Sequence, residues 1–337
     1  MSVNYTERGE GAPIADFLSE HAQVLSIAGF FLLCVVFFSV MTEAFLTPIN
    51  LLNVLRQAAP ILVVAVAMTF VIITAGIDLS VGSQVALINA VAAIVLAAGW
   101  LPWPLVILGM LLLGAFIGLV QGWFVAYQGI PAFIVTLAGL SILRGLALYL
   151  TQGYSIPIPD LPGFLALGRG QISGIPVPVF VAVGIAVLGM VVLARTVYGR
   201  RVVAVGSNPE AARRAGMPAR ATITSVYVLA GVASAVAGLL IAARLGSGSS
   251  NAAVGFELQV IAAVVLGGTS LFGGRGTILG TLLGALTIAV IGNGLILMHI
   301  SPFFTQIVTG TIILIAIWLN TRIFTASFRF GGASGKG

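Results

Sequence analysis

The residues that could carry chemistry in this chain are a few polar side chains inside apolar sequence. Between Arg56 and Arg144 the only formal charge is Asp78. If this stretch crosses a bilayer, a charge at its centre costs about 2.5–3.5 kcal/mol, so the carboxylate must be capped, paired or hydrated. Asp78 fits the N-cap of a helix predicted over 80–99, and Ser80 is the other candidate for that position.

Arg144 faces the same energetic objection, because it lies inside an apolar helix predicted over 130–151. Its guanidinium should turn toward a cavity, a carboxylate or backbone carbonyls. The alternative is that the long side chain reaches the outer membrane surface along its own aliphatic stem. A pair with Asp78 is not expected, since the predicted topology puts Asp78 near the inner face and Arg144 toward the outer one.

Neutral polar residues in the apolar segments offer a second kind of chemistry, because amides and hydroxyls could hydrogen-bond a hydroxyl-rich solute as it crosses. Phe133 and Tyr149 could stack on a sugar face, while Glu257 and His299 are assigned to outer helix ends. For each polar residue, interhelical hydrogen bonding is the competing interpretation. The neutral candidates are Gln84, Asn89, Gln121, Ser141, Asn293, Gln306 and Thr309.

A polar island at 195–220 interrupts the apolar sequence and holds six of the fifteen basic residues. Within it, Ser207 and Glu210 have the spacing of a capping box, which predicts a short helix. Pro209 suits the first turn, and Gly216 suits the position after the helix end. Ala211 and Ala212 would then present a small, flat surface. This segment is either a docking helix or a solvated connector whose arginines only fix topology.

Several functions are excluded or disfavoured by what the sequence lacks. It has no G-x-x-x-x-G-K-[ST] phosphate-binding loop, so ATP hydrolysis would need another subunit. No Cys/His cluster or Ser-His-Asp arrangement stands in a plausible position, and neither catalysis, a metal nor a cofactor is predicted. The net charge of +6 comes from arginines beside apolar spans, which argues for membrane topology and against nucleic acid. Cys34, the only cysteine, excludes an intrachain disulfide.

Composition places the chain in a membrane. It is 59% hydrophobic and 7% charged, whereas soluble domains are roughly 25% charged. We predict an all-α transmembrane bundle of eight to ten spans, in which 257–273 is the weakest and could be re-entrant or broken. Glycines at four-residue spacing, at 114–122 and 280–284, predict close helix packing. The spans are 24–42, 57–76, 80–99, 104–127, 130–151, 176–195, 221–243, 257–273, 277–298 and 302–320.

The distribution of arginine predicts the orientation, because flanks rich in Lys and Arg stay in the cytoplasm. The predicted cytoplasmic loop is 196–220, and counting spans outward from it puts both termini inside. The domain organisation that follows is a cytoplasmic segment at 1–22, a transmembrane domain at 23–321 and a cytoplasmic tail at 322–337. The largest external loop is then 152–175.

Four sequence blocks in order give the chain a family resemblance. They are GIDLSVGS (76–83), TLAGLSILRGLALYLTQG (136–153), GRRVVAVGSNPEAARRAG (199–216) and VLGGTSLFGGRGT (265–277). Together they resemble the ribose-type sugar permeases of ABC importers, from about residue 50 to 320. Glu210, Ala211, Ala212 and Gly216 match the Glu-Ala-Ala-x-x-x-Gly motif through which such permeases couple to an ATPase.

The resemblance implies a non-enzymatic inner-membrane subunit in bacteria that forms the path for a sugar or polyol. Its expected partners are a cytoplasmic ABC ATPase, a periplasmic binding protein and a second permease copy that forms a homodimer with the first. It also favours a gate or coupling role for Asp78. The expected coupling residues are Ser207, Glu210, Ala211, Ala212 and Gly216, and the expected path or gate residues are Asp78, Ser80, Gln84, Asn89, Arg144 and Asn293.

Three alternatives stay open. A branched-chain amino acid permease shares this general architecture, but its zwitterionic substrate would favour charged or helix-end sites over neutral polar ones. An ion-coupled secondary transporter needs intramembrane carboxylates or histidines, and Asp78 alone is little provision. A membrane scaffold without transport is the third. The sequence does not identify the solute.

Overall fold

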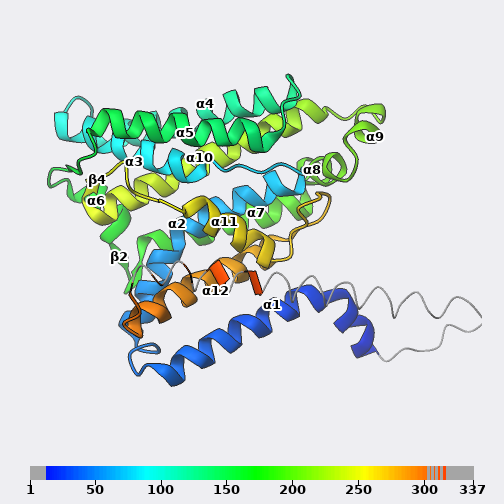
Figure 1. Ribbon diagram of the computed structural model, residues 1–337, viewed down its shortest axis with the longest axis horizontal. Coiled ribbons are helices and arrows are strands. Elements are labelled where there is room, and N and C mark those ends of the chain that lie inside the picture. The colour runs from blue at the N-terminus through cyan, green and yellow to red at the C-terminus, as the bar shows by residue number, and fades with distance from the viewer. Residues whose placement is uncertain (1–12, 302–303, 305–306, 308–309, 312–313, 316–337) are drawn as a thin grey trace, which may run out of the picture.

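The computed structural model describes residues 13–301 and, beyond them, 304, 307, 310–311 and 314–315. This part is almost entirely helical (Figure 1), with four two-residue strands. The predicted span 302–320 and the tail 322–337 therefore fall largely or wholly outside the described residues. The helices are α1 (Pro13–Met41), α2 (Pro48–Ile73), α3 (Val81–Ala98), α4 (Trp103–Ala126), α5 (Ala132–Thr151), α6 (Pro162–Arg169), α7 (Val177–Arg195), α8 (Val197–Ser207), α9 (Pro209–Arg214), α10 (Ala219–Leu245), α11 (Phe256–Leu266) and α12 (Ile278–Leu297).

Eight helices of the described part are long and apolar enough to cross a membrane: α1 to α5, α7, α10 and α12. This confirms the predicted membrane bundle. The weak span expected at 257–273 is instead α11, which has only 11 residues. At 1.5 Å per residue it covers about half of a 30 Å hydrocarbon core. The glycines after Leu266 end it early, so the broken-helix interpretation is the correct one.

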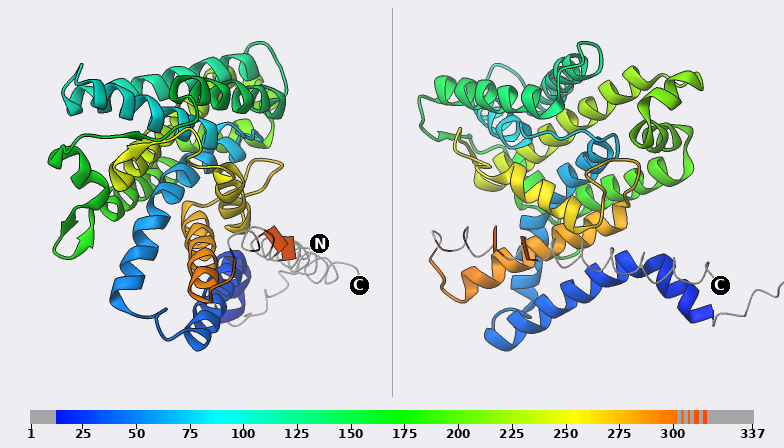
Figure 2. Two further views of the ribbon diagram at one scale, coloured as in Figure 1. Left: turned by 60° about the vertical axis from the view of Figure 1, so that its left-hand side comes forward. Right: turned by 45° about the vertical axis from the view of Figure 1, so that its right-hand side comes forward.

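The spans form an inner and an outer group. Most of α2, α3, α10 and α12 is buried inside the protein, whereas α1, α4, α5 and α7 expose most of their apolar surface. Because these outer helices carry many exposed large apolar side chains, their exposed faces suit lipid. α1 packs beside α12, as the two views of Figure 2 show, and Phe38 of α1 shares a buried cluster with Ile291 of α12. The inner group is where polar side chains can avoid lipid.

Glycine packing joins these helices as the sequence predicted. A Cβ on Gly114 or Gly118 of α4 would collide with the backbone of Gly231 or Tyr227 of α10. Gly284 of α12 lies equally close to the backbone of α11. Such close approach lets van der Waals contact hold helices together in a bilayer, where the hydrophobic effect contributes little.

The two ends of the bundle carry different structures. Figure 1 places α8 and α9 at one end and α6 with the strands at the other. The strands form two antiparallel pairs, of β1 (Ile156–Pro157) with β4 (Ser247–Gly248) and of β2 (Gln171–Ile172) with β3 (Ile175–Pro176). The segments 196–220 and 152–175 therefore lie at opposite ends, as the predicted topology requires.

Candidate functional site

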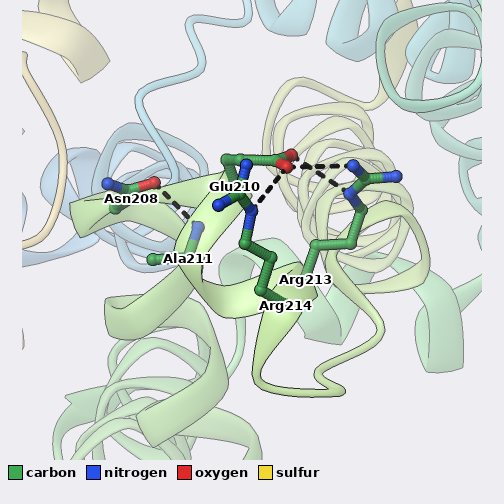
Figure 3. Close-up of polar contacts among 5 residues, drawn as sticks. All are labelled: Asn208, Glu210, Ala211, Arg213 and Arg214. Atoms are coloured by element: carbon green, nitrogen blue, oxygen red, sulfur yellow. Dashed lines mark hydrogen bonds and ion pairs between the residues drawn. The ribbon is translucent and has the colours of Figure 1, made fainter.

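The short helix α9 projects from one end of the bundle and is held by its own side chains (Figure 3). Asn208 Oδ1 accepts a hydrogen bond of 2.9 Å from the amide of Ala211. Glu210 receives two hydrogen bonds from the Arg213 guanidinium, at 3.0 and 3.1 Å, and one from Arg214 Nε at 3.1 Å. These bonds, those from Arg213 first, lower the pKa of the Glu210 carboxyl below its usual value. The helix therefore presents an ordered, charged surface at neutral pH.

Two details of the predicted capping are wrong. Ser207 is the last residue of α8, and its hydroxyl donates to the Val203 carbonyl at 2.9 Å, so Asn208 is the N-cap in its place. Of the two alanines predicted to form the flat surface, Ala212 is buried against Val205 and Ala211 is exposed. Gly216 does follow the helix with a φ of +79°, which a left-handed helix end requires. The signal for Asn208 was the N-P dipeptide, where an Asn before a helix-starting proline is a strong cap.

The end of α8 connects α9 to the interior. A Cβ on Gly206 would collide with the carbonyl oxygen of Ile73 and lie 2.9 Å from the amide nitrogen of Gly274. Gly274 itself donates to the Ile73 carbonyl at 2.8 Å. The two glycine-rich breaks, after α2 and after α11, therefore meet at one junction beneath α8. Sequence reasoning missed Gly206, because nothing local distinguishes it from the other glycines.

Asp78 lies at the centre of a buried polar network where α3 begins. Its Oδ1 accepts from the amide of Ser80 at 2.8 Å and from the Ser80 hydroxyl at 2.6 Å. Gln84 Nε2 and Gln121 Nε2 each donate to Ser80 Oγ at 2.8 Å. Asp78, Ser80 and Gln84 are fully buried. Ser80 is therefore the residue at the N-cap position of α3, and Asp78 accepts hydrogen bonds from it. The Ser80 side chain makes no capping hydrogen bond to the helix.

Asn89 and Arg144 both hold the loop 246–255 that precedes α11. Asn89 Oδ1 accepts from the amide of Ser249 at 2.6 Å. Arg144 Nη1 donates to the Ala252 carbonyl at 3.0 Å and also contacts the Ser250 carbonyl. Arg144 therefore turns to carbonyls, one of the predicted partners, and does not pair with Asp78. These two residues therefore provide hydrogen-bond partners for backbone groups of this loop, and such groups are costly to leave unpaired inside a membrane protein.

A cavity of about 950 Å³ lies between α2, α10, α12 and the loop that leads into α11. Its size is in the range of small-molecule sites. Asn293 lines it and forms a reciprocal amide pair with Asn50, at 2.9 and 3.0 Å. Of the predicted path residues, only Asn293 reaches this cavity. The other polar residues on its wall are Gln57, Arg244, Asn251, Glu257 and Gln259.

Glu257 does not fit its assignment to an outer helix end, because its carboxylate points at Gly82 of α3 inside the bundle. His299 is exposed after α12. Phe133 and Tyr149 are 55% and 73% exposed on α5 and lie away from the cavity, so they do not stack on a solute there. The Ser141 hydroxyl bonds its own helix. Gln306 and Thr309 fall outside the described residues.

Comparison with known proteins shows similarity along most of the chain. The family model described as "Branched-chain amino acid transport system / permease component" matches residues 50–317. The ribose import permease protein RbsC of Bacillus subtilis is 43% identical, over 87% of this chain and 91% of its own length. The xylose transport system permease protein XylH of Escherichia coli is 36% identical, over 90% and 93%. The probable ABC transporter permease protein YphD of Escherichia coli is 40% identical, over 93% and 94%. No solved structure matches.

Proposed function

The chain belongs to the family described as "Branched-chain amino acid transport system / permease component". From this premise we propose that it is the permease subunit of an ABC importer for a sugar. The observation that carries the substrate class is an identity of 43% and 36%, over most of the chain, to permeases named for ribose and xylose. The chain is a multi-pass membrane protein, and the cavity beside α2, α10 and α12 has the size of a small-solute site. Pentoses, hexoses and polyols fit this proposal equally.

A separate ABC ATPase supplies the energy in this proposal and docks on α9. Support comes from the exposed, internally braced surface of Glu210, Ala211, Arg213 and Arg214. Ser207 is exposed at the end of α8, next to that surface, and Ala212 supports the surface from beneath through its contact with Val205. Gly216 ends the docking element. The junction at Gly206 then passes a push on α9 to both glycine-rich breaks.

Two further partners belong to this proposal, a periplasmic binding protein and a second permease copy. A periplasmic binding protein delivers the sugar to the end that carries 152–175, where α6 and the strand pairs form an ordered surface. A second permease copy, identical to the first, completes the path. In this arrangement the predicted cytoplasmic loop 196–220 faces the ATPase, and both termini lie in the cytoplasm.

The path and gate residues divide into three roles. Asp78, Ser80 and Gln84 form a buried polar network with Gln121, whose hydrogen bonds share Ser80 Oγ, and in this proposal the network closes the path. Asn89 and Arg144 hold the loop 246–255 in position. Asn293 is the member that lines the cavity and can meet the solute.

Two other transport classes compete with this proposal. The description of the family model names branched-chain amino acids, but the similar chains are named for ribose and xylose, and their identity to this chain favours sugar. A proton-coupled transporter would use Asp78. That carboxylate is already engaged by the amide and hydroxyl of Ser80, which argues for a structural role.

Reconstitution tests the class. The permease is placed in proteoliposomes with its ATPase and binding protein, and uptake of D-ribose and D-xylose is measured with and without ATP. We expect ATP-dependent uptake that persists when the proton gradient is collapsed, both in the native chain and in Asp78→Asn, whose amide oxygen can still accept from Ser80. Uptake without ATP that disappears with the proton gradient would instead establish a secondary transporter.

A further inference from the structure

Two arginines lie together at the end of the bundle that carries α6 and the strand pairs. Arg244 is in the last turn of α10, just before β4, and Arg56 on α2 is close enough for the two like charges to act on each other. Arg244 lines the cavity, and so does Gln57, the residue next to Arg56. Because an arginine side chain stays protonated in proteins, both groups are permanent positive charges. The cavity therefore has one positive group in its wall and a second one close to it.

The guanidinium of Arg244 is free to act on the contents of the cavity. The carbonyl oxygen of Arg244 accepts a hydrogen bond from Arg169 Nε at 2.9 Å, but its guanidinium has no hydrogen bond or ion pair with any described residue. None of the guanidinium nitrogens is among the buried atoms that lack a partner, which means that they have accessible surface. Arg56 also has no ion pair with a described residue, and its Nε atom is buried without a partner. Neither positive charge is neutralised within the described part of the protein.

The acidic residues of the chain do not cancel this charge. Glu43 and Asp160 stand just before α2 and α6, but neither lines the cavity nor forms an ion pair with a described residue. Glu257 is in the cavity wall, but the cation on which its charge acts is Arg144 and not Arg244. No acidic residue follows Glu257 in the sequence. Cations therefore outnumber anions around the cavity even when Glu257 is counted as charged.

A neutral sugar and a small cation respond differently to this positive charge. A neutral solute carries no net charge for the arginines to repel. A monovalent cation about 10 Å from one fixed positive charge, in a medium of intermediate dielectric, is disfavoured about tenfold. Channels and transporters use an arginine in this way to exclude protons and cations. A sugar path needs such a barrier, because ions that leak through it would dissipate the gradients across the membrane.

We propose that Arg244, reinforced by Arg56, forms a cation barrier in the sugar path, which admits a neutral solute and keeps Na⁺ and protons out. This rests on the proposed sugar permease function and adds ion selectivity to it. Arg244 also suits the dipole at the C-terminal end of α10. A role in helix stability alone, however, predicts no change in ion selectivity when the charge is removed.

The test uses the full importer in proteoliposomes, with its ATPase, its sugar-loaded binding protein and ATP. Fluxes of radioactive Na⁺ and Cl⁻ are measured beside uptake of D-ribose and D-xylose, in the native chain and in Arg244→Lys, Arg244→Met and Arg244→Glu. The ratio of Na⁺ flux to Cl⁻ flux should stay native in Arg244→Lys, rise about tenfold in Arg244→Met and rise further in Arg244→Glu. Sugar uptake per ATP should persist in Arg244→Lys and Arg244→Met, because the solute is neutral.

Two further variants are matched comparisons. Arg56→Met removes the second charge and should raise the ratio less than Arg244→Met does, because Arg56 does not itself line the cavity. Gln57→Met places the same side chain on the cavity wall without a change of charge, so it should leave the ratio native. Loosened packing would raise the Na⁺ and Cl⁻ fluxes together, and the ratio therefore separates it from the loss of a charge barrier.

The outcomes distinguish this inference from the proposed function. If the native importer takes up neither D-ribose nor D-xylose with ATP, the sugar assignment fails and the barrier fails with it. If the native importer moves sugar and Arg244→Met keeps the native ratio of Na⁺ to Cl⁻ flux, the barrier alone is overturned. An equal rise of both fluxes in Arg244→Met would also overturn it, because that result indicates loosened packing. A native ratio together with a loss of the ATP hydrolysis that the binding protein stimulates would overturn it in favour of a docking contact.

Discussion

Glu210 and Glu257 occupy the same place in two short helices, since each is the second residue, after Pro209 in α9 and after Phe256 in α11. Their surroundings differ. Three and four residues after Glu210, α9 has arginines that bind its carboxylate. At the same spacing from Glu257, α11 has Val260 and Ile261, which offer nothing polar.

The difference shows how one residue type serves two purposes. The Glu210 carboxylate forms ion pairs with arginines of its own helix, and these pairs order a surface for a partner. The Glu257 carboxylate has no partner in its own helix, and its Oε2 oxygen is packed against Gly82 of α3. Spacing within the helix decides the first case, and packing between helices decides the second. Three substitutions test this comparison: one at Gly206, one at Arg144, which holds the loop before Glu257, and one at Glu210 itself.

The largest effect is expected at Gly206, where the end of α8 meets the glycine-rich breaks after α2 and after α11. In Gly206→Ala the new methyl group meets the backbone of Ile73 and Gly274, which cannot move aside as a side chain could. Overpacking of this kind costs about 1–3 kcal/mol. We expect a lower unfolding temperature of the purified permease and less uptake per ATP. Gly184→Ala on α7, where nothing lies within 4 Å, is the control. A variant at Gly206 that behaves like this control would remove the junction from the coupling route.

An intermediate effect is expected when the loop before Glu257 is released. Arg144→Leu removes the donor to the Ser250 and Ala252 carbonyls and leaves them unsatisfied. Hydrogen bonds to a charged group contribute about 1.5–3 kcal/mol each, so we expect uptake to fall about tenfold. Arg144→Lys retains a charge and a donor and should recover part of the activity. Uptake measured for both variants at equal membrane abundance decides this, and native uptake by Arg144→Leu would contradict it.

The smallest effect is expected from the exposed glutamate. Glu210→Gln removes the charge that Arg213 and Arg214 share at the surface of α9. Exposed ion pairs contribute little, so the affinity for the ATPase should weaken only about twofold, and less at high salt. Titration of the ATPase into permease in nanodiscs at two salt concentrations measures this. A loss as large as that of Gly206→Ala would show that Glu210 contacts the ATPase directly.

Much of the fold was readable from the sequence because membrane helices obey local rules. Apolar length located nine of the ten predicted spans, counting the short α11, and glycine spacing located close helix contacts. The tenth prediction, 302–320, stays a prediction. The capping pattern located α9 but chose Ser207 where the cap is Asn208, because two adjacent polar residues both have capping side chains. The buriedness of Ala212 depends on Val205 of the preceding helix, which local spacing does not report.

The site was less predictable, because its members meet across long sequence separations. Asp78, Ser80 and Gln84 lie close in sequence and form one hydrogen-bonded network. Their short spacing is why the sequence could group them as candidates for one site. Glu257 was placed at an outer end because its distance from α3 in sequence hides the contact with Gly82.

By itself, then, the sequence determined the membrane class, the helical spans, the resemblance to sugar permeases and the short polar helix. These follow from composition, apolar length and spacing within single helices. Only the tertiary structure decided which polar residues pair, which of them line the cavity and which carboxylates lack an ion-pair partner. That choice rests on contacts between helices far apart in the chain, where a missing Cβ or a carbonyl supplied by a loop fixes the position of a charge.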